Sequence, residues 1–256
     1  DVSAAQVIPD TIVGDYRELD VLRRFADGCD AITFDHEHVP TKYLEELGGF
    51  AAVRPGPLAL VYAQDKADMR EYLGDFGVPC PAWTALPRDP EDASAALAAF
   101  LAEHADAAGQ AVLKTSRGGY DGKGVRVVHA ASEIADWLGI EGSDGADVAG
   151  EANTAGEANV AGSVGVEILI EEKIPFVSEA AQLVARRPSG DISTWPVVQT
   201  IQEQGTCFEV IAPAPDVDGA LAERIRDIGE KVAEELDVVG ILAVELFLAP
   251  GGDGQL

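Results

Sequence analysis

The chain has 256 residues, of which 45 are Asp or Glu and 18 are Lys or Arg, so its formal net charge at pH 7 is −27. This excess of acid disfavours binding to nucleic acid and to anionic membranes, because both reward clustered basic side chains. Hydrophobic residues make up 47% of the sequence, and no apolar run reaches the roughly 18 residues of a membrane span. We therefore expect a folded cytoplasmic protein without nucleic-acid or membrane partners. Its three cysteines show no Cys-x-x-Cys spacing and should be reduced thiols.

Short apolar runs alternate with a helical stretch over the first 40 residues, an order typical of a βαβ unit. The pattern predicts strands at 7–8, 11–13 and 31–34 and a helix at 16–26. Three more helices follow, each with a recognisable start or stop. Their expected ranges are 41–47, which Gly48 and Gly49 end; 64–76, which Gly77 and Pro79 end; and 90–109, which Asp89 caps.

The pattern changes to strands from residue 111 onward. The expected strands cover 111–115, 125–129, 167–175, 179–187, 193–202, 207–212 and 241–249, with a short helix at 132–138 and an amphipathic helix at 218–236. Residues 141–165 are rich in Ala, Gly and acidic side chains and repeat the string Ala-Gly-Glu-Ala-Asn. Because this segment has few apolar groups to offset the entropy of ordering, we expect a disordered acidic insertion.

A glycine-rich segment, TSRGGYDGKG, separates the strands at 111–115 and 125–129. Four glycines within residues 118–124 let backbone N–H groups approach an anion without obstruction from Cβ atoms, and Lys114 adds a cation just before them. The segment is not a Walker loop, because a strand follows it instead of a helix. Two interpretations stay open: a hairpin flap that covers phosphates, and an ordinary hairpin with surface charges.

Glu245 is the one acid within the apolar strand ILAVELFLA. A buried carboxylate costs several kcal/mol unless it meets a cation or hydrogen-bond donors, and Mg2+ is one such cation. Strand alternation places Glu245 on the face of Ala243 and Phe247. A carboxylate at the rim of the sheet and a buried ion pair are the alternatives.

Two further patterns carry weaker signals. Glu171 and Glu179 suit ribose hydroxyl groups, and the backbone around Lys173 suits the edge of a base, although acidic strand ends are often simply solvated. The string TFDHEHVP contains two histidines around Glu37, but two histidines without a third ligand seldom form a metal site. We expect Glu37 to accept a hydrogen bond from a polar substrate at the carboxyl end of its strand.

In combination these strings resemble the N5-carboxyaminoimidazole ribonucleotide synthetases, a family of ATP-grasp ligases. The resemblance rests on TFDHEHVP, AQDKADMREYLGDFGVPCPAW, VLKTSRGGYDGKGVRVV, IEEKIPFVSEAAQLVARR and GILAVELFL, of which GGYDGKG is the most specific. It implies an α/β (α+β) ATP-grasp fold preceded by a partial Rossmann-like domain, truncated at both ends. The implied domains are 1–58 and 59–256, with 108–172 as a flap subdomain that carries the acidic insertion.

The resemblance also implies roles for individual residues. For ATP it implies Lys66, Lys114, Gly118, Gly119, Tyr120, Asp121, Gly122, Lys123, Gly124, Glu171, Glu172, Lys173, Ile174 and Glu179. For the ribonucleotide it implies Glu37, Tyr120 and Lys123, with Asp121 and Lys123 catalytic and Asp121 beside the reacting amine; for Mg2+ (or Mn2+) it implies Glu245. Lys66 and Lys123 stand where Arg is usual in the family. Gln199, Thr200 and Gln202 also depart from its pattern, which leaves nucleotide contacts from that strand open.

The implied reaction is the ATP-dependent carboxylation of 5-aminoimidazole ribonucleotide with bicarbonate, a step of purine biosynthesis. ATP and Mg2+ are the implied cofactors, and a homodimer is compatible with the resemblance. One alternative is another ATP-grasp ligase, such as the formate-dependent glycinamide ribonucleotide transformylase. The other is a non-catalytic nucleotide-binding fragment, if the protein ends at Leu256; the family places its second metal carboxylate beyond that point.

Overall fold

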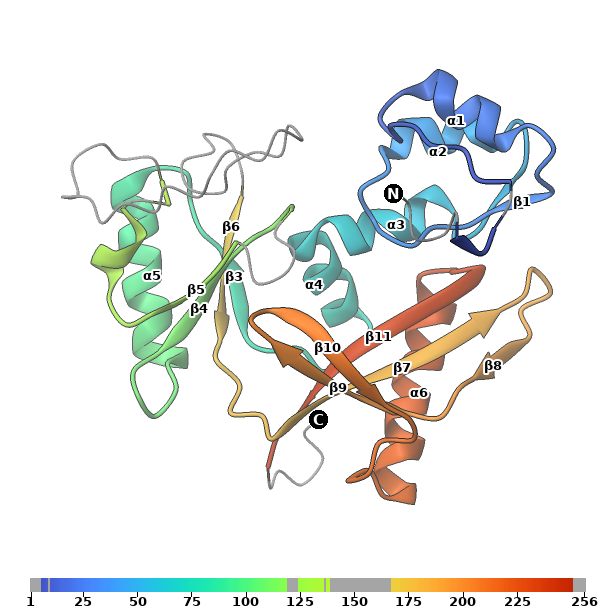
Figure 1. Ribbon diagram of the computed structural model, residues 1–256. Helices are drawn as coiled ribbons and strands as arrows, with labels where there is room; N and C mark the ends of the chain where they lie inside the picture. The colour runs from blue at the N-terminus through green and yellow to red at the C-terminus, as the bar shows by residue number, and fades with distance from the viewer. Residues whose placement is uncertain (1–5, 9, 119–123, 136, 139–166, 251–256) are drawn as a thin grey trace.

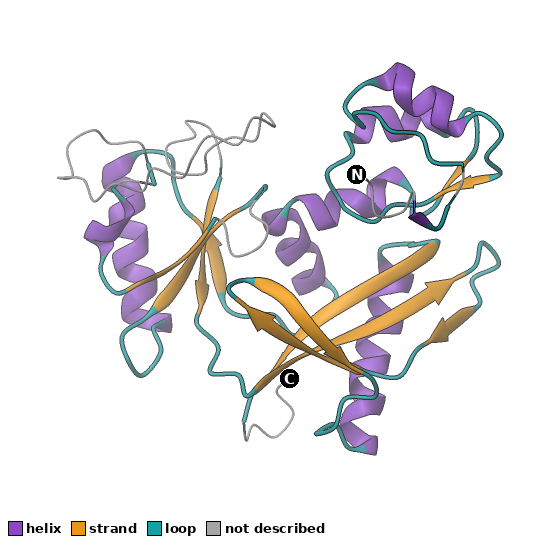
Figure 2. Cartoon of the chain, in the orientation of Figure 1, coloured by secondary structure: helices purple, strands orange, loops and turns teal. Residues whose placement is uncertain are grey.

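The computed structural model describes residues 6–8, 10–118, 124–135, 137–138 and 167–250, which form helices and short sheets (Figures 1 and 2). The helices are α1 (Leu19–Ala26), α2 (Thr41–Leu47), α3 (Pro57–Gln64), α4 (Lys66–Asp75), α5 (Pro90–His104), the 3-10 helix η2 (Ala131–Ile134) and α6 (Gly219–Glu235). The strands are β1 (Ala31–Ile32), β2 (Ala52–Val53), β3 (Trp83–Ala85), β4 (Ala111–Thr115), β5 (Val125–Val128), β6 (Ile168–Glu172), β7 (Ser178–Arg186), β8 (Ile192–Thr194), β9 (Val198–Glu203), β10 (Thr206–Ile211) and β11 (Gly240–Leu248).

The N-terminal region packs α1, α2 and α3 around the parallel pair β1 and β2. Its core includes Leu44 and Leu47, which are almost completely buried. The expected strands at 7–8 and 11–13 are wrong, because the described residues there are turn or coil and Val7 and Val13 are exposed. These two apolar runs do not join a sheet, and within the described chain β1 pairs only with β2.

Two helix predictions in this region need correction. The first helix begins at Leu19 rather than at residue 16, because a turn precedes it in which the Asp15 side chain accepts a hydrogen bond from the backbone N–H of Arg17 (2.8 Å). The second, expected at 64–76, is α4, and the sequence analysis missed α3 directly before it. Asp65 alone separates these two helices, with an extended backbone (φ −126°, ψ 111°).

The first of two larger sheets has the strand order β3-β6-β4-β5 and is antiparallel. Helix α5 and η2 cover one face, where Leu97 and Phe100 pack against Leu113 and Ile170. The strands predicted at 111–115 and 125–129 are confirmed as the hairpin β4–β5, with Lys114 opposite Val125. The helix expected at 132–138 is only a short 3-10 turn in the described chain.

The second sheet has the order β10-β9-β7-β11, and β8 pairs with β7. Helix α6 covers one face, on which Gly229 lies so close to β7 that a Cβ atom there would be 2.7 Å from the Gln182 side chain. The single strand expected at 193–202 is wrong: Trp195, Pro196 and Val197 separate β8 from β9, because proline cannot donate to a ladder.

The other face of this sheet carries the acidic side chains. In the β7–β11 register Phe247 lies opposite Glu179, and Glu245 lies opposite Ala181, so both acids share the face turned away from α6. The interpretation of Glu245 as a buried carboxylate that requires a cation is wrong, since Glu245 is exposed. Only one face of this apolar strand is covered by the helix.

Helix α4 contacts both the first sheet and helix α6, which covers the second sheet (Figure 1). At its start the backbone N–H of Lys66 donates to the carbonyl of Ser116 at the end of β4 (2.9 Å). At its other end, the Lys231 side chain from α6 donates to the carbonyl of Phe76. None of the helices in the described ranges is long and apolar enough to cross a membrane.

Candidate functional site

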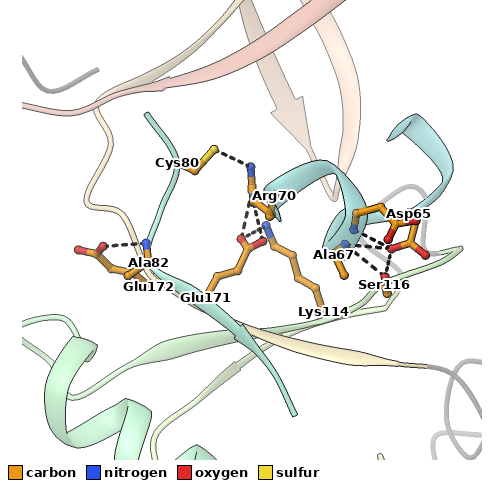
Figure 3. A network of polar contacts seen from close by, with 10 residues as sticks. Asp65, Ala67, Arg70, Cys80, Ala82, Lys114, Ser116, Glu171 and Glu172 are labelled. Atoms are coloured by element: carbon orange, nitrogen blue, oxygen red, sulfur yellow. Dashed lines mark hydrogen bonds and ion pairs between the residues drawn. The ribbon is translucent and has the colours of Figure 1, made fainter. Parts of the chain in front are cut away.

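A buried carboxylate shared by two cations forms the centre of the site (Figure 3). Glu171 is 2% exposed. Its Oε2 atom lies 2.6 Å from Lys114 Nζ, and its Oε1 atom lies 3.1 Å from Arg70 Nε. A second guanidinium contact joins Arg70 Nη2 to Oε2 at 3.4 Å. The three residues come from β6, β4 and α4, so this cluster ties the helix to the first sheet.

Strand alternation explains why these side chains meet. Leu113 and Ile170 point into the core beneath α5, so their neighbours Lys114 and Glu171 point to the opposite face of the sheet. Burial raises the pKa of Glu171, but the charges and hydrogen bonds of Lys114 and Arg70 outweigh it, so the pKa lies below its ordinary value. The carboxylate is therefore ionised at neutral pH, and the local charge of the cluster is positive.

Lys66 adds a third cation beside this cluster. Its Nζ atom donates to the carbonyl of Gly118 (3.0 Å), the first residue of the glycine-rich segment 118–124. Burial lowers the pKa of Lys66, and the like charge of Lys114 lowers it further, while Glu37 and Glu171 act in the opposite direction. A partly buried ammonium group held next to another cation is well placed to bind an anion, which relieves the repulsion.

Gln64 and Asp65, which immediately precede Lys66, hold two other segments of the site. The Gln64 amide donates to the carbonyls of Glu37 (2.7 Å) and Val39 (3.2 Å), which fixes the loop that follows β1. The Asp65 carboxylate accepts a hydrogen bond from the Ser116 hydroxyl and lies 2.6 Å from Arg117 Nε. Glu37 is thereby brought close enough to Lys66 to affect its pKa.

The loop around Glu37 contains both histidines of the string TFDHEHVP. The ring centroids of His36 and His38 lie 5.3 Å apart, and the backbone N–H of His38 donates to His36 Nδ1 (3.1 Å). No group of three or more His, Cys, Asp or Glu side chains suited to a metal ion occurs within the described ranges. The strand expected at 31–34 ends at Ile32, and the loop is a turn rather than a continuing strand, so strand alternation does not determine where these side chains point.

On the second sheet, Glu179, Gln202 and Glu245 form a smaller acidic group. Burial raises the pKa of Glu179, a hydrogen bond with Gln202 lowers it, and the nearby charge of Glu245 raises it, with a net shift upward. Gln202 thus contacts the acid that the resemblance assigns to ribose. Two neighbouring carboxylates on the face turned away from α6 are suited to hydroxyl groups or to a hard cation.

The structure separates the other expected residues of the adenine stretch. The Glu172 carboxylate accepts a hydrogen bond from the backbone N–H of Ala82 (3.4 Å), and Lys173 Nζ pairs with Asp106 (3.0 Å). The carbonyl of Ile174 accepts a hydrogen bond from Phe176 N–H (2.9 Å). These contacts direct the Glu172 and Lys173 side chains away from the Glu171 cluster, so any base contact there would use the backbone.

Part of the expected phosphate flap lies outside the described residues. This applies to Gly119, Tyr120, Asp121, Gly122 and Lys123, and also to the acidic insertion at 141–165. The flanking glycines are described, and both have positive φ angles of 69° at Gly118 and Gly124. Such angles favour glycine, which explains the glycines at these two ends of the segment.

Arg70, Gln64 and Asp65 belong to the site although no sequence pattern described above predicts them as site residues. The helical spacing could have indicated Arg70, because it lies four positions after Lys66 and so on the same face of α4. Its partner Glu171 is 101 positions away, which no local pattern reveals. Asp65 is a residue type typical of a helix N-cap, and this local role gives no indication of its contacts with the end of β4.

The fold and this cluster define a class of protein. The Ribonucleotide synthetase preATP-grasp domain family matches residues 1–64, and the ATP-grasp domain family matches residues 71–253. The chain belongs to the ATP-grasp family, with a preATP-grasp domain before it. The expected fold class is confirmed.

Among individual proteins, the chain is similar to the N5-carboxyaminoimidazole ribonucleotide synthase of Corynebacterium ammoniagenes, with 41% identity over 96% of this chain and 53% of the relative. A solved ADP complex of N5-carboxyaminoimidazole ribonucleotide synthetase matches with a TM-score of 0.75 and 25% identity, over 96% of this chain and 57% of that one. The Thermus thermophilus synthetase matches with a TM-score of 0.71 and 26% identity, over 93% of this chain and 56% of that one. The chain spans about half the length of the curated relatives it matches.

Proposed function

We propose that this chain belongs to an enzyme that uses ATP to carboxylate 5-aminoimidazole ribonucleotide with bicarbonate, forming N5-carboxyaminoimidazole ribonucleotide, ADP and phosphate. The observation that carries the proposal is the cationic cluster of Lys66, Lys114 and Arg70 around Glu171, at the base of the glycine-rich segment. The similarity to synthetases of this specificity supports the same reaction. The division into residues 1–58 and 59–256, with 108–172 as a flap subdomain, is part of the proposal.

The cluster supports ATP as the phosphoryl donor. Lys114 and Lys66 present two ammonium groups on one side of the first sheet, and that of Lys66 contacts Gly118. Triphosphate oxygens would bind these cations, together with backbone N–H groups of the glycine-rich segment. Glu171 already neutralises Arg70 in part and keeps Lys114 oriented, so little reorganisation is needed when the anion arrives.

The carboxylates on the second sheet are suited to a nucleotide-bound Mg2+. This ion is usually held by one or two carboxylates together with phosphate oxygens and water, and not by a cage of protein ligands. Glu245 is exposed on the face turned away from α6 and affects the pKa of Glu179, which fits such a donor set. We assign Glu245 to the metal and Glu179 to the ribose. The bound ion would neutralise charge on the transferring phosphoryl group.

The proposed mechanism has three chemical steps. A bicarbonate oxygen attacks the γ-phosphorus while the bond to the ADP oxygen breaks, which gives carboxyphosphate; Lys114 and Lys66 stabilise the charge on the equatorial oxygens. The carbon–oxygen bond of carboxyphosphate then breaks to give CO2 and phosphate. The exocyclic amine of the ribonucleotide bonds to that carbon and loses a proton. We assign Asp121 as the base that accepts this proton. Glu37 and Tyr120 are proposed to orient the ribonucleotide, and Lys123 to stabilise the developing carbamate.

A comparison of acceptors tests the proposal in the full-length protein. ADP release is measured with 5-aminoimidazole ribonucleotide and bicarbonate, and in parallel with glycinamide ribonucleotide and formate. The proposal expects release only with the first pair, together with stoichiometric carboxylated product. Release that requires formate would assign the protein to the transformylase group of ATP-grasp ligases. ATP binding without release under either condition would support a non-catalytic nucleotide-binding role. A homodimer and a cytoplasmic location stay predictions.

A further inference from the structure

Asp65 caps helix α4 and also contacts a second segment of the chain, the residues that follow β4. As the N-cap of α4, its Oδ1 atom accepts hydrogen bonds from the backbone N–H groups of Ala67 (3.0 Å) and Asp68 (3.3 Å). The same atom accepts a hydrogen bond from the Ser116 hydroxyl, and Oδ2 lies 2.6 Å from Arg117 Nε. One carboxylate therefore joins the start of α4 to the residues that follow β4 (Figure 3).

The capping residues Asp89 and Asp218 provide an internal comparison. Asp89 accepts hydrogen bonds from Glu91 and Asp92 N–H, and Asp218 accepts one from Leu221 N–H, all within their own helices. Both of these caps are exposed, whereas Asp65 is 6% exposed. Capping alone does not require a buried carboxylate, so the contacts with Ser116 and Arg117 demand a separate explanation.

Further contacts extend this junction on both sides of Asp65. The backbone N–H of Lys66 donates to the Ser116 carbonyl (2.9 Å), and the Ala67 N–H also lies within 3.3 Å of Ser116 Oγ. Asp65 and Arg117 form an isolated β-bridge. Burial raises the pKa of Asp65, but the hydrogen bonds from Ser116 and from α4 and the charge of Arg117 outweigh it, so its pKa is lowered. The carboxylate is thus ionised at neutral pH.

The consequence concerns the placement of two cations. Lys66 follows Asp65 directly, and Lys114 lies two residues before Ser116, so the junction holds together the backbone positions from which the two lysine side chains extend. Their ammonium groups repel each other, and after burial this repulsion is the second cause of the lowered pKa of Lys66. Without the Asp65 side-chain contacts, fewer contacts would hold the start of α4 against the end of β4, chiefly the backbone hydrogen bond from Lys66 to Ser116. We propose that Asp65 is a positioning residue that holds Lys66 beside Lys114 for a polyphosphate ligand, an inference that rests on the proposed use of ATP.

Asp65→Ser in the full-length protein separates the two roles, because serine caps a helix as well as aspartate does, but its one neutral hydroxyl cannot replace the charged contacts of the Asp65 carboxylate with Ser116 and Arg117. ATP binding is measured by calorimetry in the presence of Mg2+. We expect the ATP Kd to rise about tenfold, the scale of one lost charged hydrogen bond. The matched control Asp89→Ser, at a helix start without a second segment, should leave the Kd within about twofold.

Two further variants make the test specific to the junction. Ser116→Ala should raise the ATP Kd about threefold, less than Asp65→Ser does, because the Asp65 carboxylate loses one hydrogen bond but keeps its contact with Arg117. The double variant of Asp65→Ser with Ser116→Ala should bind no more weakly than Asp65→Ser alone, because both changes break the same contact. A double variant whose ATP Kd rises by the product of the two single-variant increases would overturn the proposal. The fraction of protein that binds ATP should stay unchanged, since a merely structural defect would lower that fraction and leave the Kd of the remainder intact.

The outcomes distinguish this inference from the function on which it rests. If the wild-type protein binds no ATP, the proposed function fails and this inference fails with it. If the wild type binds ATP and Asp65→Ser binds it equally well, only the positioning role is refuted. Should Asp65→Ser fail to fold, Ser116→Ala decides alone: an unchanged Kd overturns the proposal, and a threefold rise supports it.

Discussion

Replacement of Glu171 by Gln tests whether the buried carboxylate is the counter-ion of the site. Glu171 is 2% exposed and contacts both Lys114 and Arg70, whose side chains are 18% and 15% exposed. The glutamine side chain would keep the shape of glutamate but leave two largely buried cations without a negative charge. Removal of one partner from a buried ion pair costs about 3–5 kcal/mol. Because both cations retain some contact with solvent, we expect a loss of about 3 kcal/mol in the free energy of unfolding, at the low end of that range.

The effect should depend on pH in a defined direction. The pKa of Glu171 is lowered in the folded state. Its stabilisation is therefore fully present above the ordinary pKa of glutamate, about 4.3, and is lost as the pH falls through the lower folded value. The difference in stability between wild type and Glu171→Gln should be constant from neutral pH down to about pH 5 and should shrink below about pH 4.

The assay is thermal unfolding followed by circular dichroism, at pH 7 and at a series of lower pH values. For a chain of this size, about 3 kcal/mol corresponds to a decrease of roughly 6–12 °C in Tm. Glu172→Gln is the matched control on the same strand, because its carboxylate makes only a 3.4 Å contact with Ala82 N–H; its Tm should change by less than about 3 °C. A decrease of less than about 2 °C for Glu171→Gln, or a decrease equal to that of the control, would refute the counter-ion role.

Three further predictions concern the proposed chemistry. Lys114→Met should keep most of the stability, because Arg70 still pairs with Glu171, but should weaken catalysis with ATP by about 2–3 kcal/mol in kcat/KM; wild-type kinetics would contradict its role. Glu245→Gln should raise the Mg2+ requirement for ATP cleavage, while Asp121→Asn should spare ATP binding and slow carboxylation; in a Mg2+ titration, rescue of Asp121→Asn but not of Glu245→Gln would reverse these roles. Gln64→Ala should raise the KM for the ribonucleotide about tenfold through its loop contacts, with an unchanged ATP Kd, and a change confined to ATP would contradict this.

Local patterns predicted the elements that carry the site more reliably than the contacts within it. The hairpin around the glycine-rich segment was predictable because strand alternation and glycine positions are local properties. The resemblance also identified Lys114 and Glu171. Alternation does not specify their mutual contact, however, and the third member of the cluster, Arg70, lies on a helix 101 residues before Glu171. Long-range ion pairs of this kind are decided by packing.

The errors have identifiable physical causes. Burial of Glu245 was considered because its strand is continuously apolar, but α6 covers only one face of that sheet. The strands expected at 7–8 and 11–13 have suitable residues but no neighbouring strand among the described residues. Asp65 has the sequence signature of a helix cap, and its contacts with Ser116 and Arg117 depend on how α4 meets β4. In each case the sequence does not show which part of the folded chain packs against the residue or segment concerned.

The central claim is that ATP phosphorylates bicarbonate before the ribonucleotide is carboxylated. The most direct measurement uses bicarbonate labelled with oxygen-18 and follows the label into the inorganic phosphate released by the full-length protein with ATP and 5-aminoimidazole ribonucleotide. If carboxyphosphate forms and its carbon–oxygen bond then breaks, one bicarbonate oxygen stays on phosphorus, so the phosphate should carry one labelled oxygen per turnover. Unlabelled phosphate released together with carboxylated product would contradict the proposed mechanism.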